Sequence, residues 1–131
     1  KDHSRQMLAL KLRQRDYPPP VINAVLQRLA GDNIIDDNKF GEHYLQFLLR
    51  KKKYGRGKLS AKLREKGLSR ELSERLVAGI DDSEEVDALR KSAEKLFRKT
   101  NMTEEKMARS LIRRGFPPSK VYACITEYFS F

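Results

Sequence analysis

The chain has 131 residues, 39% of them hydrophobic and 35% charged, so it is long enough for one ordinary domain but more charged than usual. Its 28 Lys and Arg exceed its 18 Asp and Glu, and the net charge of +10 favours an anionic partner over a merely solvated basic surface. The single cysteine, Cys124, excludes an internal disulfide and suits core packing in a reducing cytosol, and no apolar run is long enough to span a membrane.

One short sequence motif occurs three times along the chain. Residues 12–18 (LRQRDYP) recur as 63–69 (LREKGLS) and again as 111–117 (LIRRGFP), at intervals of roughly 50 residues. Apolar residues stand four positions before each leading leucine, namely Leu8, Leu59 and Met107. A period of this size is typical of stacked helical units, and it argues against a single core around a catalytic pocket.

Each copy is expected to form a helix, a sharp turn and a second helix. In the first copy Ser4 suits the N-cap, and Met7, Leu8 and Leu12 form the apolar stripe of the helix. Asp16, Gly67 and Gly115 then occupy matching turn positions, where a helix commonly ends with positive φ. The next residue of each copy is large and apolar and is predicted to fill the gap between the helices, namely Tyr17, Leu68 and Phe116.

The second helices begin with proline or serine, at residues 18–20, at Ser69 and at residues 117–119. Their predicted apolar faces comprise Val21, Val25, Leu26 and Leu29; Leu72, Leu76, Val77 and Ile80; and Val121, Cys124, Ile125 and Phe129.

A third helix is expected after the first two copies. Asp37 is the predicted cap of one, with Phe40, Tyr44, Phe47 and Leu48 on its apolar face. Asp82 is the predicted cap of the other, with Glu85 as its capping-box partner. The apolar face of that helix comprises Val86, Leu89, Ala93, Leu96 and Phe97.

The predicted fold is therefore all-α, an elongated tandem repeat of three-helix units with about eight helices, the last unit lacking its third helix. The expected units are residues 1–53, residues 54–100 and residues 101–131, the last with two helices. The glycine-containing link at residues 53–57 is predicted to be a hinge.

Basic residues concentrate around that link and form the predicted partner-binding or nucleic-acid-binding surface. The candidates are Arg50, Lys51, Lys52, Lys53, Tyr54, Arg56, Lys58, Lys62, Arg64, Lys66, Arg113 and Arg114. Lysine and arginine neutralise phosphates, and Tyr54 could stack on an unpaired base. Cations also favour helix C-termini, which explains two or three of these charges but not the whole run.

Nothing in the residue inventory indicates an enzyme, a cofactor or a metal site. Residues 81–85 are acidic but suit a helix start, and His3 and His43 lack partners at zinc-ligand spacing. Residues 55–58 (GRGK) lack the strand and spacing of a P-loop.

Several separated segments resemble the RecX family, bacterial regulators of the recombinase RecA. The resemblance rests on residues 33–40 (NIIDDNKF), on Tyr44, Arg50 and Gly55, and on residues 63–68 (LREKGL). Residues 2–4 with 11–12, and residues 113–116, resemble the first and last repeats of the family. The chain departs from the family at Asp16, where glycine is usual, and at Tyr17 with its three prolines.

The resemblance implies a non-enzymatic, cytoplasmic modulator that binds the RecA filament on single-stranded DNA and dampens its ATPase, strand-exchange and coprotease activities. It also implies weak direct DNA binding, with no membrane association, and a monomer is expected. The alternative is a helical DNA-binding protein that acts without RecA. Against this alternative, the second helices carry mixed charge, as at Glu71, Glu74 and Arg75, where recognition helices need base-reading side chains.

Overall fold

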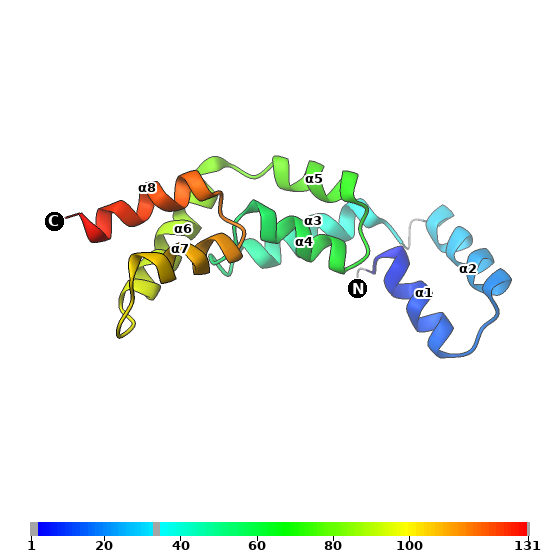
Figure 1. Ribbon diagram of the computed structural model, residues 1–131. Coiled ribbons are helices and arrows are strands. Elements are labelled where there is room, and N and C mark those ends of the chain that lie inside the picture. The colour runs from blue at the N-terminus through cyan, green and yellow to red at the C-terminus, as the bar shows by residue number, and fades with distance from the viewer. Residues whose placement is uncertain (1–2, 33–34, 131) are drawn as a thin grey trace.

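A computed structural model of the chain describes residues 3–32 and 35–130; Asp2, Asn33 and Ile34, which contribute to the family resemblance, lie outside the described residues. Within these ranges the chain forms eight α-helices and no strand, which confirms the predicted all-α fold. The helices are α1 (Arg5–Gln14), α2 (Pro19–Gly31), α3 (Asp37–Leu49), α4 (Arg56–Glu65), α5 (Arg70–Ala78), α6 (Asp82–Phe97), α7 (Glu104–Arg113) and α8 (Pro118–Phe129). They form an elongated, arched row with α2 at one end and α8 at the other (Figure 1).

The helix starts follow local capping chemistry. The hydroxyl of Ser4 accepts a hydrogen bond from the Met7 N–H, and Ser69 and Thr103 cap α5 and α7 in the same way. The cap of α3 is Asp36, whose carboxylate accepts from the Lys39 N–H at 3.1 Å. The prediction of Asp37 was therefore wrong by one position, because only Asp36 has the extended backbone of an N-cap.

The three turns have the predicted backbone. Asp16, Gly67 and Gly115 have φ values of 64°, 96° and 92°. The large residue that follows is buried in the second and third copies, where Leu68 is 4% and Phe116 is 1% exposed. In the first copy Tyr17 is 47% exposed, so the prediction that it fills the gap between α1 and α2 was wrong.

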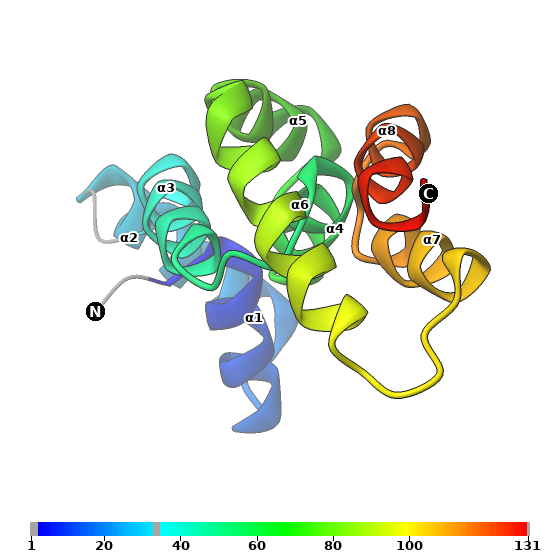
Figure 2. The same ribbon diagram turned by 90° about the vertical axis from the view of Figure 1, so that its left-hand side faces the viewer.

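The hydrophobic core is divided into three clusters along the row. One joins α3, α4 and α5, a second joins α6, α7 and α8, and a small third cluster joins α1 and α2 with Ile35. Each third helix of the sequence repeat thus packs on the helix pair that follows it (Figure 2). The first pair is packed mainly on itself, which leaves Tyr17 uncovered. The predicted boundaries after residues 53 and 100 follow the sequence period and remain predictions, whereas the packing groups run across them.

Three predicted core residues lie at the surface instead. Val21, Phe47 and Phe97 are exposed, while Ile22 and Leu45 are buried. The helical period was assigned correctly, because the predicted residues Leu26, Phe40 and Leu48 are buried, but the buried faces of α2 and α3 also include Ile22 and Leu45 and leave out Val21 and Phe47.

The link at residues 53–57 connects α3 to α4 within one cluster, and backbone hydrogen bonds hold it against the α7–α8 turn of another cluster. The Gly55 N–H donates to the Arg114 carbonyl at 2.9 Å, and the Gly57 N–H donates to the Gly115 carbonyl at 3.2 Å. A side chain at Gly55 would collide with the backbone of Gly115 and Phe116. The glycines permit close approach of two backbones, so the prediction of a hinge was wrong.

Candidate functional site

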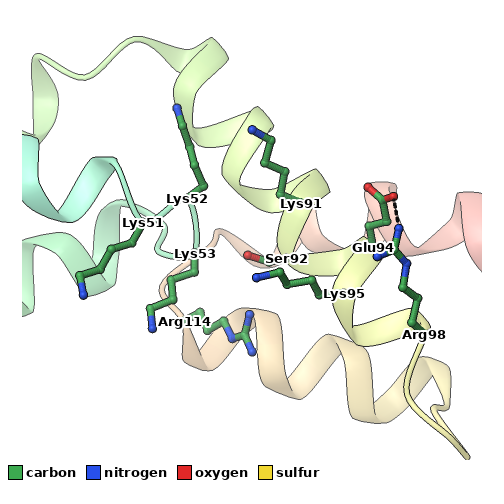
Figure 3. Close-up of a pocket in the computed structure, with 9 residues that line it drawn as sticks. All are labelled: Lys51, Lys52, Lys53, Lys91, Ser92, Glu94, Lys95, Arg98 and Arg114. Atoms are coloured by element: carbon green, nitrogen blue, oxygen red, sulfur yellow. Dashed lines mark hydrogen bonds and ion pairs between the residues drawn. The ribbon is translucent and has the colours of Figure 1, made fainter.

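Part of the predicted basic run lines a groove with a volume of about 320 Å³. The loop between α3 and α4 contributes Lys51, Lys52 and Lys53, and the end of α7 contributes Arg114 (Figure 3). These residues are more than sixty positions apart in the sequence, and they meet because the α3–α4 loop is hydrogen-bonded to the α7–α8 turn. The structure thus brings four of the candidate residues into one site.

The third side of the groove is α6, which sequence reasoning missed. It contributes three further cations, Lys91, Lys95 and Arg98, together with Ser92 and Glu94. Lys91, Lys95 and Arg98 are spaced at four and then three residues and so share one helix face, a pattern that was available in the sequence. Which face α6 turns toward the loop depends on long-range packing, so the sequence alone did not place them in the site.

Only some of the groove cations are paired. Lys52 Nζ and Lys91 Nζ lie 3.6 and 3.4 Å from the Asp87 carboxylate. Arg98 Nη2 lies 2.8 Å from Glu94 Oε1.

The other four cations of the groove are not paired with a carboxylate of the described residues. Within the described ranges, the side chains of Lys51, Lys53, Lys95 and Arg114 form no ion pair. The groove therefore carries a surplus of positive charge and could bind an anion.

Aromatic rings adjoin the groove along α3. Phe40, Tyr44 and Phe47 are stacked in sequence, with ring centroids 5.9 and 6.1 Å apart. Lys51 Nζ lies 4.9 Å from the centroid of the exposed Phe47 ring, so one residue borders both the groove and the stack. Sequence reasoning assigned Phe47 to the core and therefore missed this exposed ring.

Tyr54 lies between two of the candidate lysines. Its ring centroid is 5.3 Å from Lys53 Nζ and 4.9 Å from Lys62 Nζ, and the half-buried side chain also packs against the core shared by α3, α4 and α5. Lys66 Nζ lies 5.4 Å from the Tyr44 ring. These are cation–π arrangements that hold the cations along the seam between α3 and α4.

The remaining candidates do not line the groove. Arg50, Arg64 and Arg113 are exposed elsewhere, and Lys58 is half-buried beside the α7–α8 turn. Arg56 is engaged in the fold, because its guanidinium donates to the Ile80 carbonyl and to the carboxylates of Asp82 and Glu85.

The acidic stretch at residues 81–85 has a structural role. Asp81 is the N-cap position of α6 but makes no side-chain capping bond, and Glu85 is buried against Arg56 and Lys120. The prediction of a capping box from Asp82 to Glu85 was therefore wrong, because the Glu85 carboxylate binds Arg56 and Lys120 and not the start of its own helix. Across residues 3–32 and 35–130, no group of His, Cys, Asp and Glu side chains could hold a metal ion. None of the helices described is long and apolar enough to cross a bilayer.

The chain matches two family models, the first three-helix domain of RecX over residues 1–29 and the second three-helix domain of RecX over residues 36–75. The regulatory protein RecX of Mycobacterium sp. (strain KMS) is 32% identical over 134 residues, which cover 94% of this chain and 72% of that relative. The chain belongs to the RecX family. The second RecX model begins at α3 and extends into α5, the same helices that share one hydrophobic cluster here.

Other RecX proteins are similar over most of this chain. The Chlorobium phaeobacteroides protein is 29% identical, and the match covers 98% of this chain and 86% of the relative. The Listeria monocytogenes protein is also 29% identical, but the chain spans only 45% of its length.

Two crystal structures share the fold. A regulatory protein RecX superposes with a TM-score of 0.88 at 25% identity, over 97% of this chain and 64% of that one. RecX from Lactobacillus salivarius superposes with a TM-score of 0.84 at 23% identity, over 97% and 86% of the two chains.

Proposed function

We propose that this protein binds the RecA filament on single-stranded DNA and modulates, in the usual case inhibits, its ATPase, strand-exchange and coprotease activities. Membership of a family of regulatory proteins supports the role of a regulator. The observation that carries the proposal is the cationic groove on an elongated row of helices, at which Lys51, Lys53, Lys95 and Arg114 form no ion pair with any described residue.

A filament of protein on DNA is an extended polyanion with regularly repeated surfaces. An arched row of helices can contact such a polymer over several subunits, and clustered positive charge accelerates encounter with it. The partner would place the protein in the cytoplasm, and no enzymatic step is needed for this role.

The test is DNA-dependent ATP hydrolysis by purified RecA. Substoichiometric amounts of this protein should lower the steady-state rate of hydrolysis on preformed filaments. Strand exchange and cleavage of a coprotease substrate should fall over the same range of concentration. An unchanged hydrolysis rate at stoichiometric excess would rule out the proposal.

Direct DNA binding without RecA is the second candidate function, and the same unpaired groove cations favour it. It predicts tight, sequence-selective binding to duplex DNA at physiological salt. Weak, strongly salt-dependent binding that lacks sequence selectivity would instead agree with contacts to phosphate alone.

A further inference from the structure

The groove contains a buried hydroxyl group without a partner. Ser92 lines the groove and is only 2% exposed, and its Oγ has no hydrogen-bond partner among the described residues. Most buried hydroxyls in proteins are satisfied, and leaving one unpaired costs on the order of 1–3 kcal/mol. An unpaired hydroxyl at this position is explained if it donates to a ligand.

The charges around Ser92 indicate the sign of that ligand. Ser92 lies on α6 between Lys91 and Lys95, opposite the loop that carries Lys53 (Figure 3). Lys53, Lys95 and Arg114 have no ion pair within the described ranges, so an anion from outside would relieve their mutual repulsion. The single carboxylate that lines the groove, that of Glu94, is bound by Arg98.

From these two observations we propose that the groove seats a phosphate group. The hydroxyl of Ser92 donates a hydrogen bond to one phosphate oxygen, and Lys53, Lys95 and Arg114 neutralise its charge. The exposed side chains of Lys53 and Lys95 reorient to admit the phosphate to the groove floor. Arginine and lysine with a neutral hydroxyl donor are the usual protein contacts of backbone phosphates.

Such a phosphate could come from the backbone of a single strand or from a nucleoside triphosphate. The exposed ring of Phe47 favours the single strand, because Lys51 borders both this ring and the groove. A base stacked on Phe47 would place its own backbone beside the groove entrance. This inference deepens the proposed function by assigning the DNA contact to the protein itself, and it is testable without RecA.

The experiment measures binding of a fluorescein-labelled oligothymidylate of about twelve nucleotides by anisotropy, with RecA absent. Ser92→Ala should weaken binding by about tenfold, the change expected when one hydrogen bond to a charged group is lost. Ser73→Ala is the matched control, because Ser73 is likewise buried and its Oγ likewise lacks a partner, but it does not line the groove. It should bind the oligonucleotide as the parent protein does.

A second pair of variants tests the charge. Lys95→Gln should weaken binding and reduce the slope of log Kd against log salt concentration by about 0.7, the value for one contact to a single strand. Lys39→Gln removes an exposed lysine of α3 that does not line the groove and should change neither quantity.

Thermal melting separates a binding role from a structural one. Neither serine substitution should lower Tm, because alanine removes an unsatisfied polar group from the interior. If Ser92→Ala binds the oligonucleotide as tightly as the parent protein and Ser73→Ala do, the proposed phosphate site is wrong, whether or not Tm changes.

Competition identifies the source of the phosphate. Displacement of the probe by unlabelled oligothymidylate, but not by ATP or tripolyphosphate at equal phosphate concentration, supports the single strand. Equal displacement by ATP would support the phosphate site but would contradict the proposal that the phosphate comes from a single strand of DNA. A Ser92→Ala protein that loses oligonucleotide binding but still inhibits RecA would support the phosphate site and separate it from filament regulation.

Discussion

The carboxylate of Glu85 accepts two hydrogen bonds from Arg56, one from its backbone N–H at 2.8 Å and one from its Nη1 at 3.0 Å. Lys120 Nζ lies 3.0 Å from the same Oε1. One buried side chain of α6 therefore binds the start of α4 and the first turn of α8, in addition to packing within its own helix. These contacts fix how the group of α3, α4 and α5 meets the group of α6, α7 and α8, and hence the geometry of the groove.

Replacement of Glu85 by alanine should lower the free energy of unfolding by about 3–5 kcal/mol, because it leaves two cations without their buried counter-charge. Urea denaturation followed by circular dichroism measures the change. Asp82→Asn is the control, since the Asp82 carboxylate is 82% exposed and its bond to Arg56 is screened by water. Equal losses in the two variants would show that burial of Glu85 is not what matters.

Replacement of Gly115 by alanine should destabilise the fold by about 1–3 kcal/mol. Gly115 has a φ of 92°, and an added Cβ would collide with the backbone of Lys58. Gly31→Ala provides the comparison, because no atom lies within 4 Å of the Cβ position there, and the substitution in α2 should stabilise by about 0.5–1 kcal/mol. Opposite signs of the two changes in Tm are expected, and a neutral Gly115→Ala would contradict the close approach of the two turns.

The parts of the fold that the sequence revealed are those set by local chemistry. Ser4 and Ser69 cap their helices, and Asp16, Gly67 and Gly115 adopt positive φ, because capping and turn geometry depend on a few adjacent residues. The failures have long-range causes. Tyr17 is exposed because none of the helices in the described residues covers the first pair as α3 covers the second, which the sequence of one repeat does not reveal.

The candidate site likewise has one part that local sequence predicted and another part that depends on long-range packing. The run at Lys51, Lys52 and Lys53 was identified from the sequence because its charges are consecutive. Ser92 and Lys95 were missed because they join the site only through the packing of α6 on α7. The predicted hinge failed for a related reason, since the partner of Gly55 is Arg114, in another repeat.

Leu63→Ala should lower the free energy of unfolding by about 2–5 kcal/mol. Leu63 is fully buried in the cluster shared by α3, α4 and α5, so truncation leaves a cavity that neighbouring helices cannot easily fill. Leu10→Ala on the exposed face of α1 removes the same atoms from a hydrated position and should have little effect on chemical denaturation. A small loss at Leu63 would mean that the repeat leucines do not define the core.

The Cys124 thiol should react with alkylating agents only at higher pH than an ordinary thiol. Burial raises the pKa of Cys124, the charge of Glu127 raises it further, and Arg90 acts in the opposite direction. The partial burial agrees with the predicted packing role of this residue in the cluster of α6, α7 and α8. The pH midpoint of the iodoacetamide rate should therefore lie above that of the same chain in guanidinium, and Glu127→Gln should lower it while Arg90→Gln raises it.

The raised pKa of Cys124 also makes the free energy of unfolding depend on pH. Because the folded state holds the thiol proton more tightly than the unfolded state, its contribution is fully present below the unfolded pKa, at about 8.5, and decreases as pH rises above that value. Cys124→Ala should remove this part of the alkaline decline. A decline that is identical in the variant would assign it to other groups.

Reversal of the charges at Lys51 and Lys53 should raise the concentration of protein needed to inhibit RecA ATP hydrolysis by at least about tenfold, because it removes steering by the groove. Lys52 is better left in place, since it pairs with Asp87 and a glutamate there would add a repulsion that disturbs the fold. The control is reversal of Lys11 and Lys39, which are exposed on α1 and α3 and do not line the groove. Both double variants have the same net charge, so a difference between them isolates position from total charge, and equal loss of inhibition would assign the effect to net charge alone.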